Sequence, residues 1–186
     1  TNFENTNGLD DTTQNHVTTA RDIALMSAEL IKHKTILKYT TIWQDTVRDG
    51  KFTLTNTNRL IRFYNGCNGL KTGSTSKAGF CMSATAERDG MQLIAVVMGA
   101  PTRDKRNSIA KKMLDFGFAN YSYYKDQGSL DNKNTINIKR SNTKSVKIGY
   151  RPYEAVTQKD KKAKIDIKVD IPEYLTAPIK KGDVAG

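Results

Sequence analysis

The tripeptide Lys71-Thr72-Gly73 combines three residue types that could together hold a peptide with a free carboxylate. The lysine brings a cation that could stabilise that carboxylate and ease proton transfer near a nucleophile. The threonine hydroxyl could donate a hydrogen bond to the same group. The glycine has no side chain, so a peptide could lie close against a strand at this position. The three residues alone also fit an ordinary strand-to-turn transition, so the surrounding sequence has to decide.

The tripeptide precedes the clearest secondary-structure pattern in the chain. Residues 78–87 are typical of a strand, Arg88-Asp89-Gly90 of a hairpin connection, and residues 91–98 of a second, buried strand. The stretch 68–73 leads into them through the polar turn 74–77. Together these segments predict an antiparallel meander.

Two helices are predicted around this meander. The first runs from about 19 to 33 and opens with a capping pattern, Thr19-Ala20-Arg21-Asp22. The second follows Pro101 and runs from about 105 to 121. In the first helix Ile23, Met26 and Leu30 are expected on one face. In the second, the residues expected on the inner face are Ile109, Met113, Phe116 and Tyr121. A mixed α/β fold, an antiparallel sheet with helices, is therefore expected.

The character of the chain changes near residue 124. A polar stretch, 125–134, suits a linker, and apolar residues then alternate with period two. The alternating residues are Ile136 and Ile138; Val146, Ile148 and Tyr150; and Ile165, Ile167 and Val169. We therefore expect a first domain over 1–123 and a small all-β domain over 124–186. Because the chain ends on a turn, the second domain is expected to be incomplete.

Composition limits the classes of partner. The 186 residues carry 30 Lys and Arg against 19 Asp and Glu, a net charge of +11. Such an excess suits nucleic acid, an anionic membrane surface or an anionic wall polymer. Neither an arginine-rich helix nor an RNA-binding aromatic signature is present, so nucleic acid is not expected as a partner. The lysine-rich run 159–164 is interpreted as a solvated loop, and the longest apolar run, 93–98, is too short to span a bilayer.

Cysteine and histidine usage argues against a metal centre. Two cysteines, Cys67 and Cys81, exclude a four-cysteine zinc site, and His16 and His33 match no metal-ligand spacing. We interpret both cysteines as free thiols. No metal is expected.

The stretch around the tripeptide resembles a known family. Residues 68–80 closely resemble the corresponding stretch of low-molecular-mass penicillin-binding proteins of the serine D-alanyl-D-alanine carboxypeptidase family. Residues 3–10 resemble the segment between the second and third motifs of that family, and residues 93–100 the strand after its hairpin. Arg106 falls where the family has an arginine, and residues 177–184 resemble part of its C-terminal β-rich domain. The resemblance therefore runs in order along essentially the whole chain.

The resemblance implies roles for five residues. Lys71 would be the third-motif cation, and Thr72 and Arg106 would bind the carboxylate of the terminal D-alanine or of a penicillin. Gly73 would let the substrate approach, and the backbone N–H of Ser74 would form half of an oxyanion hole. Many relatives have histidine where this chain has Ser74. The resemblance also implies that 1–123 is the C-terminal part of a transpeptidase/β-lactamase-like catalytic domain and that 124–186 is a small sandwich-like β domain. It implies no metal or organic cofactor.

The nucleophile is expected to lie outside this chain. The family uses a Ser-x-x-Lys, whose serine attacks the peptide carbonyl, and a Ser-x-Asn, both ahead of the segment that Thr1 begins. Stretches that satisfy the first pattern include Ser108-Ile109-Ala110-Lys111 and Ser141-Asn142-Thr143-Lys144. Both are interpreted as chance matches, because so loose a pattern recurs easily in a lysine-rich chain. The chain alone is therefore expected to be inactive.

The hypothesis is a C-terminal fragment of a serine D-Ala-D-Ala carboxypeptidase, in which the missing N-terminal segment completes the site. Its partners would be peptidoglycan stem peptides, β-lactam antibiotics and, through the parent protein, the membrane surface. Its location would be extracytoplasmic and associated with the bacterial cell membrane. Three alternatives remain: a non-catalytic wall-binding or scaffolding module, a β-lactamase, and, last, a nucleic-acid binder. The β-rich C-terminal segment argues against the β-lactamase.

Overall fold

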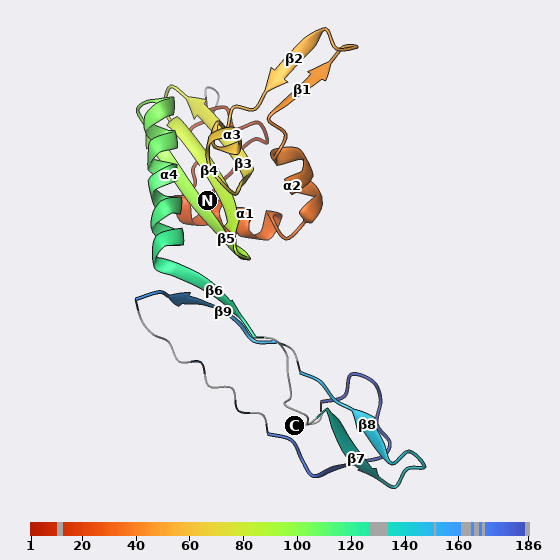
Figure 1. Cartoon of the computed structure of the whole chain (residues 1–186). Coiled ribbons are helices and arrows are strands. Elements are labelled where there is room, and N and C mark those ends of the chain that lie inside the picture. The colour runs from red at the N-terminus through yellow and green to blue at the C-terminus, as the bar shows by residue number, and fades with distance from the viewer. Residues whose placement is uncertain are drawn as a thin grey trace. The chain divides into compact units, whose positions relative to one another are not determined.

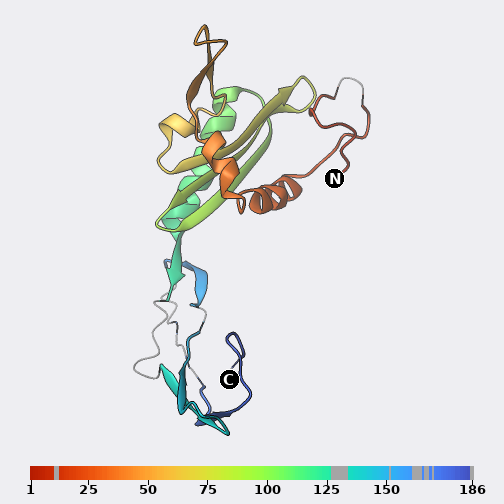
Figure 2. The ribbon, with the colours of Figure 1, turned by 90° about the vertical axis from the view of Figure 1, so that its right-hand side faces the viewer.

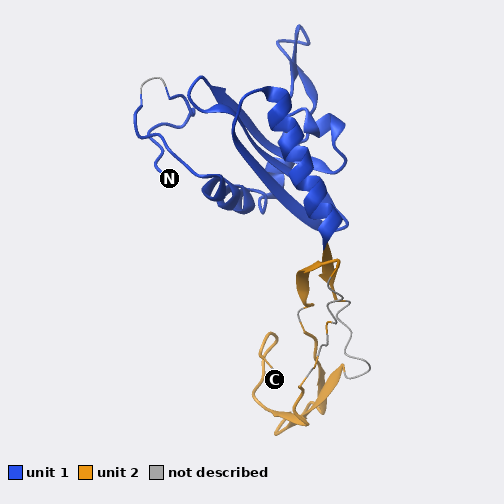
Figure 3. Ribbon diagram, turned by 90° about the vertical axis from the view of Figure 1, so that its left-hand side faces the viewer, with its two compact units in different colours: residues 1–121 blue, residues 122–186 orange. Residues whose placement is uncertain are grey.

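The computed structural model describes residues 1–10, 13–126, 134–150, 152–160, 165, 168 and 170–184. Contacts divide the chain into two compact units, Thr1–Tyr121 and Ser122–Gly186 (Figure 3). The predicted boundary followed residue 123. The assignment of these units to a catalytic and a β-rich domain stays a prediction.

The first unit is a mixed α/β structure built around one antiparallel sheet, as the sequence predicts (Figure 1). Its elements in chain order are α1 (Ala20–Leu30), α2 (Lys34–Thr40), β1 (Gln44–Val47), β2 (Phe52–Thr55), α3 (Leu60–Phe63), β3 (Cys67–Thr75), β4 (Gly79–Arg88), β5 (Met91–Ala100) and α4 (Arg103–Asn120). Strands β3, β4 and β5 form the sheet in that order, and β1 pairs with β2 in a separate hairpin. The short helices α2 and α3 were not predicted.

The β4–β5 hairpin confirms the predicted connection. Asp89 and Gly90 have φ values of 49° and 76°, so both central residues are left-handed. A two-residue turn of this kind matches the right-handed twist of the flanking strands. The antiparallel meander is thereby closed tightly at this end.

Helices α1 and α4 cover opposite faces of the sheet (Figures 1 and 2). Helix α1 begins as predicted, because the Thr19 hydroxyl accepts from a backbone N–H of the first turn at 3.1 Å. Its buried residue is Ser27, whose hydroxyl oxygen lies 2.7 Å from that of Ser83 on β4. Met26 and Leu30, which were expected to share a face with Ile23, are 43% and 44% exposed. A hydrogen-bonded pair of small serines thus lies between α1 and β4.

Helix α4 also packs with a face different from the predicted one. Met113 and Phe116 are 45% and 63% exposed. The buried residues of α4 are Arg106, Ala110, Leu114, Gly117 and Phe118. A Cβ built on Gly117 would lie 2.5 Å from Leu93 Cδ1, so the helix approaches the sheet at its small residues. The buried face therefore combines the small residues Ala110 and Gly117 with Leu114 and Phe118, and it is displaced from the face that the sequence pattern predicted.

The second unit contains five strands and no helix among its described residues. They are β6 (Tyr121–Lys125), β7 (Thr135–Lys139), β8 (Ser145–Lys147), β9 (Glu154–Gln158) and β10 (Tyr174–Thr176). Strand β6 pairs with β9; β7 pairs antiparallel with β8 and parallel with β10. The alternating pattern correctly predicted β7 and the start of β8. Of the strand expected near 165–169, residues 166, 167 and 169 lie outside the described residues, as does most of the run 159–164.

Candidate active site

Residues 71–74 lie on β3, at one edge of the β3-β4-β5 sheet. Strand β4 pairs with them in antiparallel register, with Cys81 opposite Gly73. On its other side β4 pairs with β5 over most of its length, so β3 is held at the edge of a continuous three-stranded sheet. An extended peptide could add beside such an edge strand. A Cβ built on Gly73 would meet no atom within 4 Å, so the space beside this residue is open.

Cross-strand pairing assigns each side chain of β3 to a face of the sheet. Lys71 is opposite Ser83, and Ser83 hydrogen-bonds Ser27 of α1. Thr72 is opposite Met82, whose side chain alternates with that of Ser83 and therefore points to the face that α4 covers. Lys71 thus lies on the α1 face and Thr72 on the α4 face. Ser74, two residues on from Thr72, shares its face.

Arg106 is the one charged residue of α4 that is buried, with only 3% of its surface exposed. It lies in the first turn of the helix, which the Thr102 hydroxyl caps by accepting from a backbone N–H at 3.1 Å. Arg106 Nη1 donates to the Cys81 carbonyl at 3.4 Å. Its Nε and Nη2 donate to Asn107 Oδ1 at 3.2 and 3.0 Å. The guanidinium therefore reaches the strand pair that contains Gly73.

The acceptors of Arg106 are all neutral. No carboxylate in the described part of the chain forms an ion pair with it. Burial lowers the pKa of its guanidinium, and repulsion from Arg103 adds to the effect. Arginine nevertheless keeps its charge in proteins. A buried cation without a counter-ion is costly, and an anion that bound beside it would be strongly favoured.

The Thr72 hydroxyl is held by a residue that the sequence did not single out. Thr72 is 7% exposed, and its hydroxyl oxygen lies 2.6 Å from that of Thr57. Asn58, which is 1% exposed, donates from Nδ2 to the Gly69 carbonyl at 2.8 Å. The segment that carries Thr57 is therefore fastened directly to β3.

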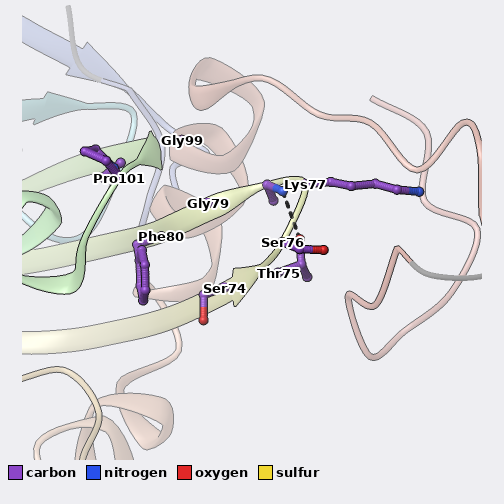
Figure 4. A pocket seen from close by; sticks show the side chains of 10 residues that line it. Ser74, Thr75, Ser76, Lys77, Gly79, Phe80, Gly99 and Pro101 are labelled. Carbon is purple, nitrogen blue, oxygen red and sulfur yellow. Dashed lines mark hydrogen bonds between the residues drawn. The ribbon is translucent and has the colours of Figure 1, made fainter.

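An open depression with a volume of about 630 Å³ begins at Ser74. It is lined by residues 74–80 and 99–101. The Ser74 and Phe80 side chains point to the same side of the hairpin, whereas Lys77 points away (Figure 4). Thr75 Oγ1 accepts from the Ala78 N–H at 2.9 Å and donates to Asp10 Oδ2 at 2.5 Å. The N-terminal segment thereby fastens the far end of β3.

Comparison with known proteins decides the family. A family model described as D-alanyl-D-alanine carboxypeptidase matches residues 1–102, more than half of the chain. The chain belongs to this family. The D-alanyl-D-alanine carboxypeptidase DacF of Bacillus subtilis is 38% identical over 192 residues, covering 100% of this chain and 49% of its own length. DacA of Haemophilus influenzae is 32% identical over 191 residues, covering 100% of this chain and 48% of its own.

Solved structures agree with the assignment to the carboxypeptidase family. Penicillin-binding protein 5 of Haemophilus influenzae has a TM-score of 0.66 and 30% identity, over 92% of this chain and 51% of that one. Penicillin-binding protein D2 of Listeria monocytogenes, in a cefotaxime-bound form, has a TM-score of 0.56 and 38% identity, over 60% of this chain and 45% of that one. The chain therefore spans about half the length of the curated relatives it matches.

Within this member of the carboxypeptidase family, the structure brings some of the expected site residues together. Thr72, Ser74 and Arg106 share the α4 face of the sheet, and Lys71 lies on the other face of the same edge strand. The roles expected for these residues stay predictions. Thr57 was not predicted from the sequence, because a single threonine carries no local signal that it hydrogen-bonds a residue of another element.

The letters of Ser-x-x-Lys also occur from Ser74 and from Ser122. The two stretches considered above, from Ser108 and from Ser141, are poorly placed. Ser108 and Lys111 are both exposed on α4. Ser141 and Lys144 are exposed between β7 and β8, in the second unit. An activated serine needs a base within reach in a sheltered position, so these sites do not favour either serine as the nucleophile.

Two further features bear on the expectations. Cys67 and Cys81 are free thiols. Among the described residues, no helix has the length and apolar character needed to cross a bilayer.

Proposed function

We propose that the protein carrying this chain is a serine-type D-Ala-D-Ala carboxypeptidase that trims the terminal D-alanine from peptidoglycan stem peptides. A serine would attack the carbonyl carbon between the two D-alanines, and the C–N bond would break. D-alanine would leave with a proton on its amine, and water would hydrolyse the ester of the acyl-enzyme. A penicillin would acylate the same serine by opening its lactam ring. Family membership and the shared fold support this proposal.

The buried guanidinium of Arg106 carries the proposal. A substrate that ends in a carboxylate would supply the counter-ion that the described residues do not provide. Thr72 lies on the same face and could donate its hydroxyl hydrogen to that carboxylate. Bonds between charged donors and acceptors are about twice as strong as neutral ones, so this pair would anchor the C-terminal end of the substrate.

The remaining residues of β3 would act on the reacting end. Lys71 would bring its cation from the α1 face and ease proton transfer at the nucleophile. Gly73 would let the peptide lie against the strand. The backbone N–H of Ser74 would donate to the oxyanion that forms on the attacked carbonyl.

The nucleophilic serine would come from a part of the protein outside this chain. Helix α1 offers a surface on which such a part could pack, because Leu25, Met26 and Leu30 are 60%, 43% and 44% exposed. We propose an extracytoplasmic, membrane-associated location for the whole protein, which suits a wall-polymer substrate.

Intact mass after incubation with benzylpenicillin, followed by peptide mapping, tests the proposal. The 186-residue chain and the longest natural polypeptide that contains it would be treated in parallel. We expect one penicilloyl adduct on the longer polypeptide, on a serine outside this chain, and none on the chain alone. No adduct on either would favour the non-catalytic wall-binding module. An adduct on a serine of this chain would show that the nucleophile is here after all.

A further inference from the structure

We infer that Thr57 is a positioning residue that orients the hydroxyl of Thr72 for donation to the substrate carboxylate. The inference rests on the proposed function, in which Thr72 binds that carboxylate. The two hydroxyl oxygens lie 2.6 Å apart, and either can be the donor. Thr57 belongs to the segment between β2 and α3, 15 residues ahead of Thr72.

The position of Thr57 is fixed on both sides. Asn56 donates from Nδ2 to the carbonyls of Thr40 and Ile42, at 3.2 and 2.9 Å. Its Oδ1 accepts from the Asn58 N–H at 2.9 Å. Asn58 in turn holds the Gly69 carbonyl of β3 at 2.8 Å. The segment is thus tied to β3 and to the end of α2, so the Thr57 hydroxyl stays within reach of Thr72.

Because each hydroxyl has a single hydrogen, Thr72 can donate to a carboxylate only if Thr57 is the donor of the bond between them. A threonine hydroxyl has one hydrogen and two acceptor positions. If Thr72 donated to Thr57, its single hydrogen would be occupied and nothing would remain for a carboxylate, which only accepts. If Thr57 donates, the Thr72 oxygen is satisfied and its hydrogen is free.

A bound carboxylate would therefore stabilise the chain of bonds from Thr57 to Thr72 to the substrate. Consecutive hydrogen bonds polarise one another, which strengthens the outer bond. Thr57 is exposed, so solvent can still donate to its oxygen. Thr72 is 7% exposed and has little such access, so it depends on Thr57 as its partner.

The test uses acylation by benzylpenicillin and by its methyl ester, which lacks the free carboxylate. The longest natural polypeptide that contains this chain would be prepared unchanged and as Thr57→Val, Thr57→Ser and Thr53→Val. Thr53 is an exposed threonine of β2 and serves as the matched control. We expect Thr57→Val to lower the second-order rate constant for the free acid about three- to tenfold and to leave that for the ester unchanged. Thr57→Ser and Thr53→Val should keep the original ratio of acid to ester.

Three outcomes would overturn the inference: equal losses with acid and ester, no loss with the acid, or a Thr57→Ser variant as slow as Thr57→Val. No acylation of the unchanged protein would instead contradict the proposed function. The hydrogen bond itself is tested separately by unfolding the 186-residue chain as Thr57→Val, Thr72→Val and the double variant. We expect the double variant to be less destabilised than the sum of the single ones. Strict additivity would mean that the two hydroxyls do not interact.

Discussion

Arg106 Nη1 donates to the backbone carbonyl of Cys81 at 3.4 Å, and Cys81 is the residue of β4 paired with Gly73. This contact connects the first turn of α4 with the edge of the sheet that carries Lys71, Thr72 and Gly73. A residue 33 positions beyond Gly73 is thereby placed against the motif. The contact uses a neutral acceptor, which leaves the positive charge of Arg106 available to a ligand.

Replacing Arg106 with methionine should not weaken the fold. Methionine retains much of the apolar stem and removes a buried charge that no described carboxylate balances. We expect the free energy of unfolding of the 186-residue chain to stay unchanged or to rise by about 1 kcal/mol. Guanidinium chloride unfolding measures it, with Arg103→Met as the exposed control, expected within about 0.5 kcal/mol of the original. A loss of more than about 2 kcal/mol would mean that Arg106 mainly supports the fold.

Gly66 lies just before β3, close to the backbone of β4 at Glu87. Gly50 is its matched control, because it has the same backbone conformation without a close neighbour. Both are left-handed, with φ values of 78° and 79°. A Cβ on Gly66 would lie 2.4 Å from the Glu87 carbonyl oxygen, whereas one on Gly50 would meet nothing within 4 Å. Gly50→Ala should cost about 1 kcal/mol for the left-handed conformation alone. Gly66→Ala should cost at least about 2 kcal/mol more, because backbone has to move. Equal costs in chemical unfolding would contradict the close approach.

Asn58 should be among the most sensitive polar residues of the first unit. It is 1% exposed, donates to the Gly69 carbonyl and accepts from the Leu60 N–H at 3.1 Å. Asn58→Ala would leave both backbone groups without these partners, and we expect a loss of about 2 to 4 kcal/mol in unfolding free energy. Asn120→Ala is the exposed control, expected to cost under about 1 kcal/mol. Similar losses for the two variants would count against the anchoring of β3 through Asn58.

The phenol of Tyr64 should make the free energy of unfolding fall at alkaline pH. Burial, and secondly the hydrogen bond that it donates to Asp115 at 2.8 Å, raise the pKa of its phenol to about 12. In the unfolded chain this pKa is near 10, so the unfolded state releases the proton first as pH rises. The contribution of Tyr64 is therefore complete below about pH 10 and lost between about pH 10 and 12.

The measurement for Tyr64 is the difference in unfolding free energy between the unchanged chain and Tyr64→Phe at pH 8, 10 and 11.5. Comparison with Phe cancels the titration of lysines, which both chains share. We expect the advantage of the unchanged chain to shrink by about 1 to 2 kcal/mol across this range. A difference that stays constant with pH would show that the folded and unfolded phenols titrate alike.

The fold was predictable where local signals are strong. The strand-like run 78–87, the Asp89-Gly90 turn and the apolar run after it were enough for β4 and β5, and the capping residue Thr19 for the start of α1. The buried faces of the helices were not, because periodicity locates apolar residues but does not say which ones pack. Gly117 of α4 faces the sheet at a point where the Leu93 side chain of β5 leaves no room for a Cβ. The sequence of α4 alone does not show where Leu93 lies.

The candidate site was predictable only as far as its residues are adjacent in sequence or match a family. Lys71, Thr72 and Gly73 form a recognisable motif, whereas Ser74 and Arg106 were identified through the resemblance to the carboxypeptidase family. The sequence did not reveal that Lys71 and Thr72 occupy opposite faces, which follows from the register of β3 against β4. The hydrogen bond between Thr57 and Thr72 has no local sequence signal, since it forms only when the segment after β2 is folded against β3.

The carboxylate preference of acylation tests the central claim most directly. The rate constants for benzylpenicillin and its methyl ester would be measured with the longest natural polypeptide that contains this chain, unchanged and as Arg106→Gln. If Arg106 binds the carboxylate, the substitution should lower the rate constant for the acid about 10- to 100-fold and leave that for the ester unchanged. An unchanged preference for the acid in Arg106→Gln would contradict the account, because the buried charge would then have no part in substrate binding.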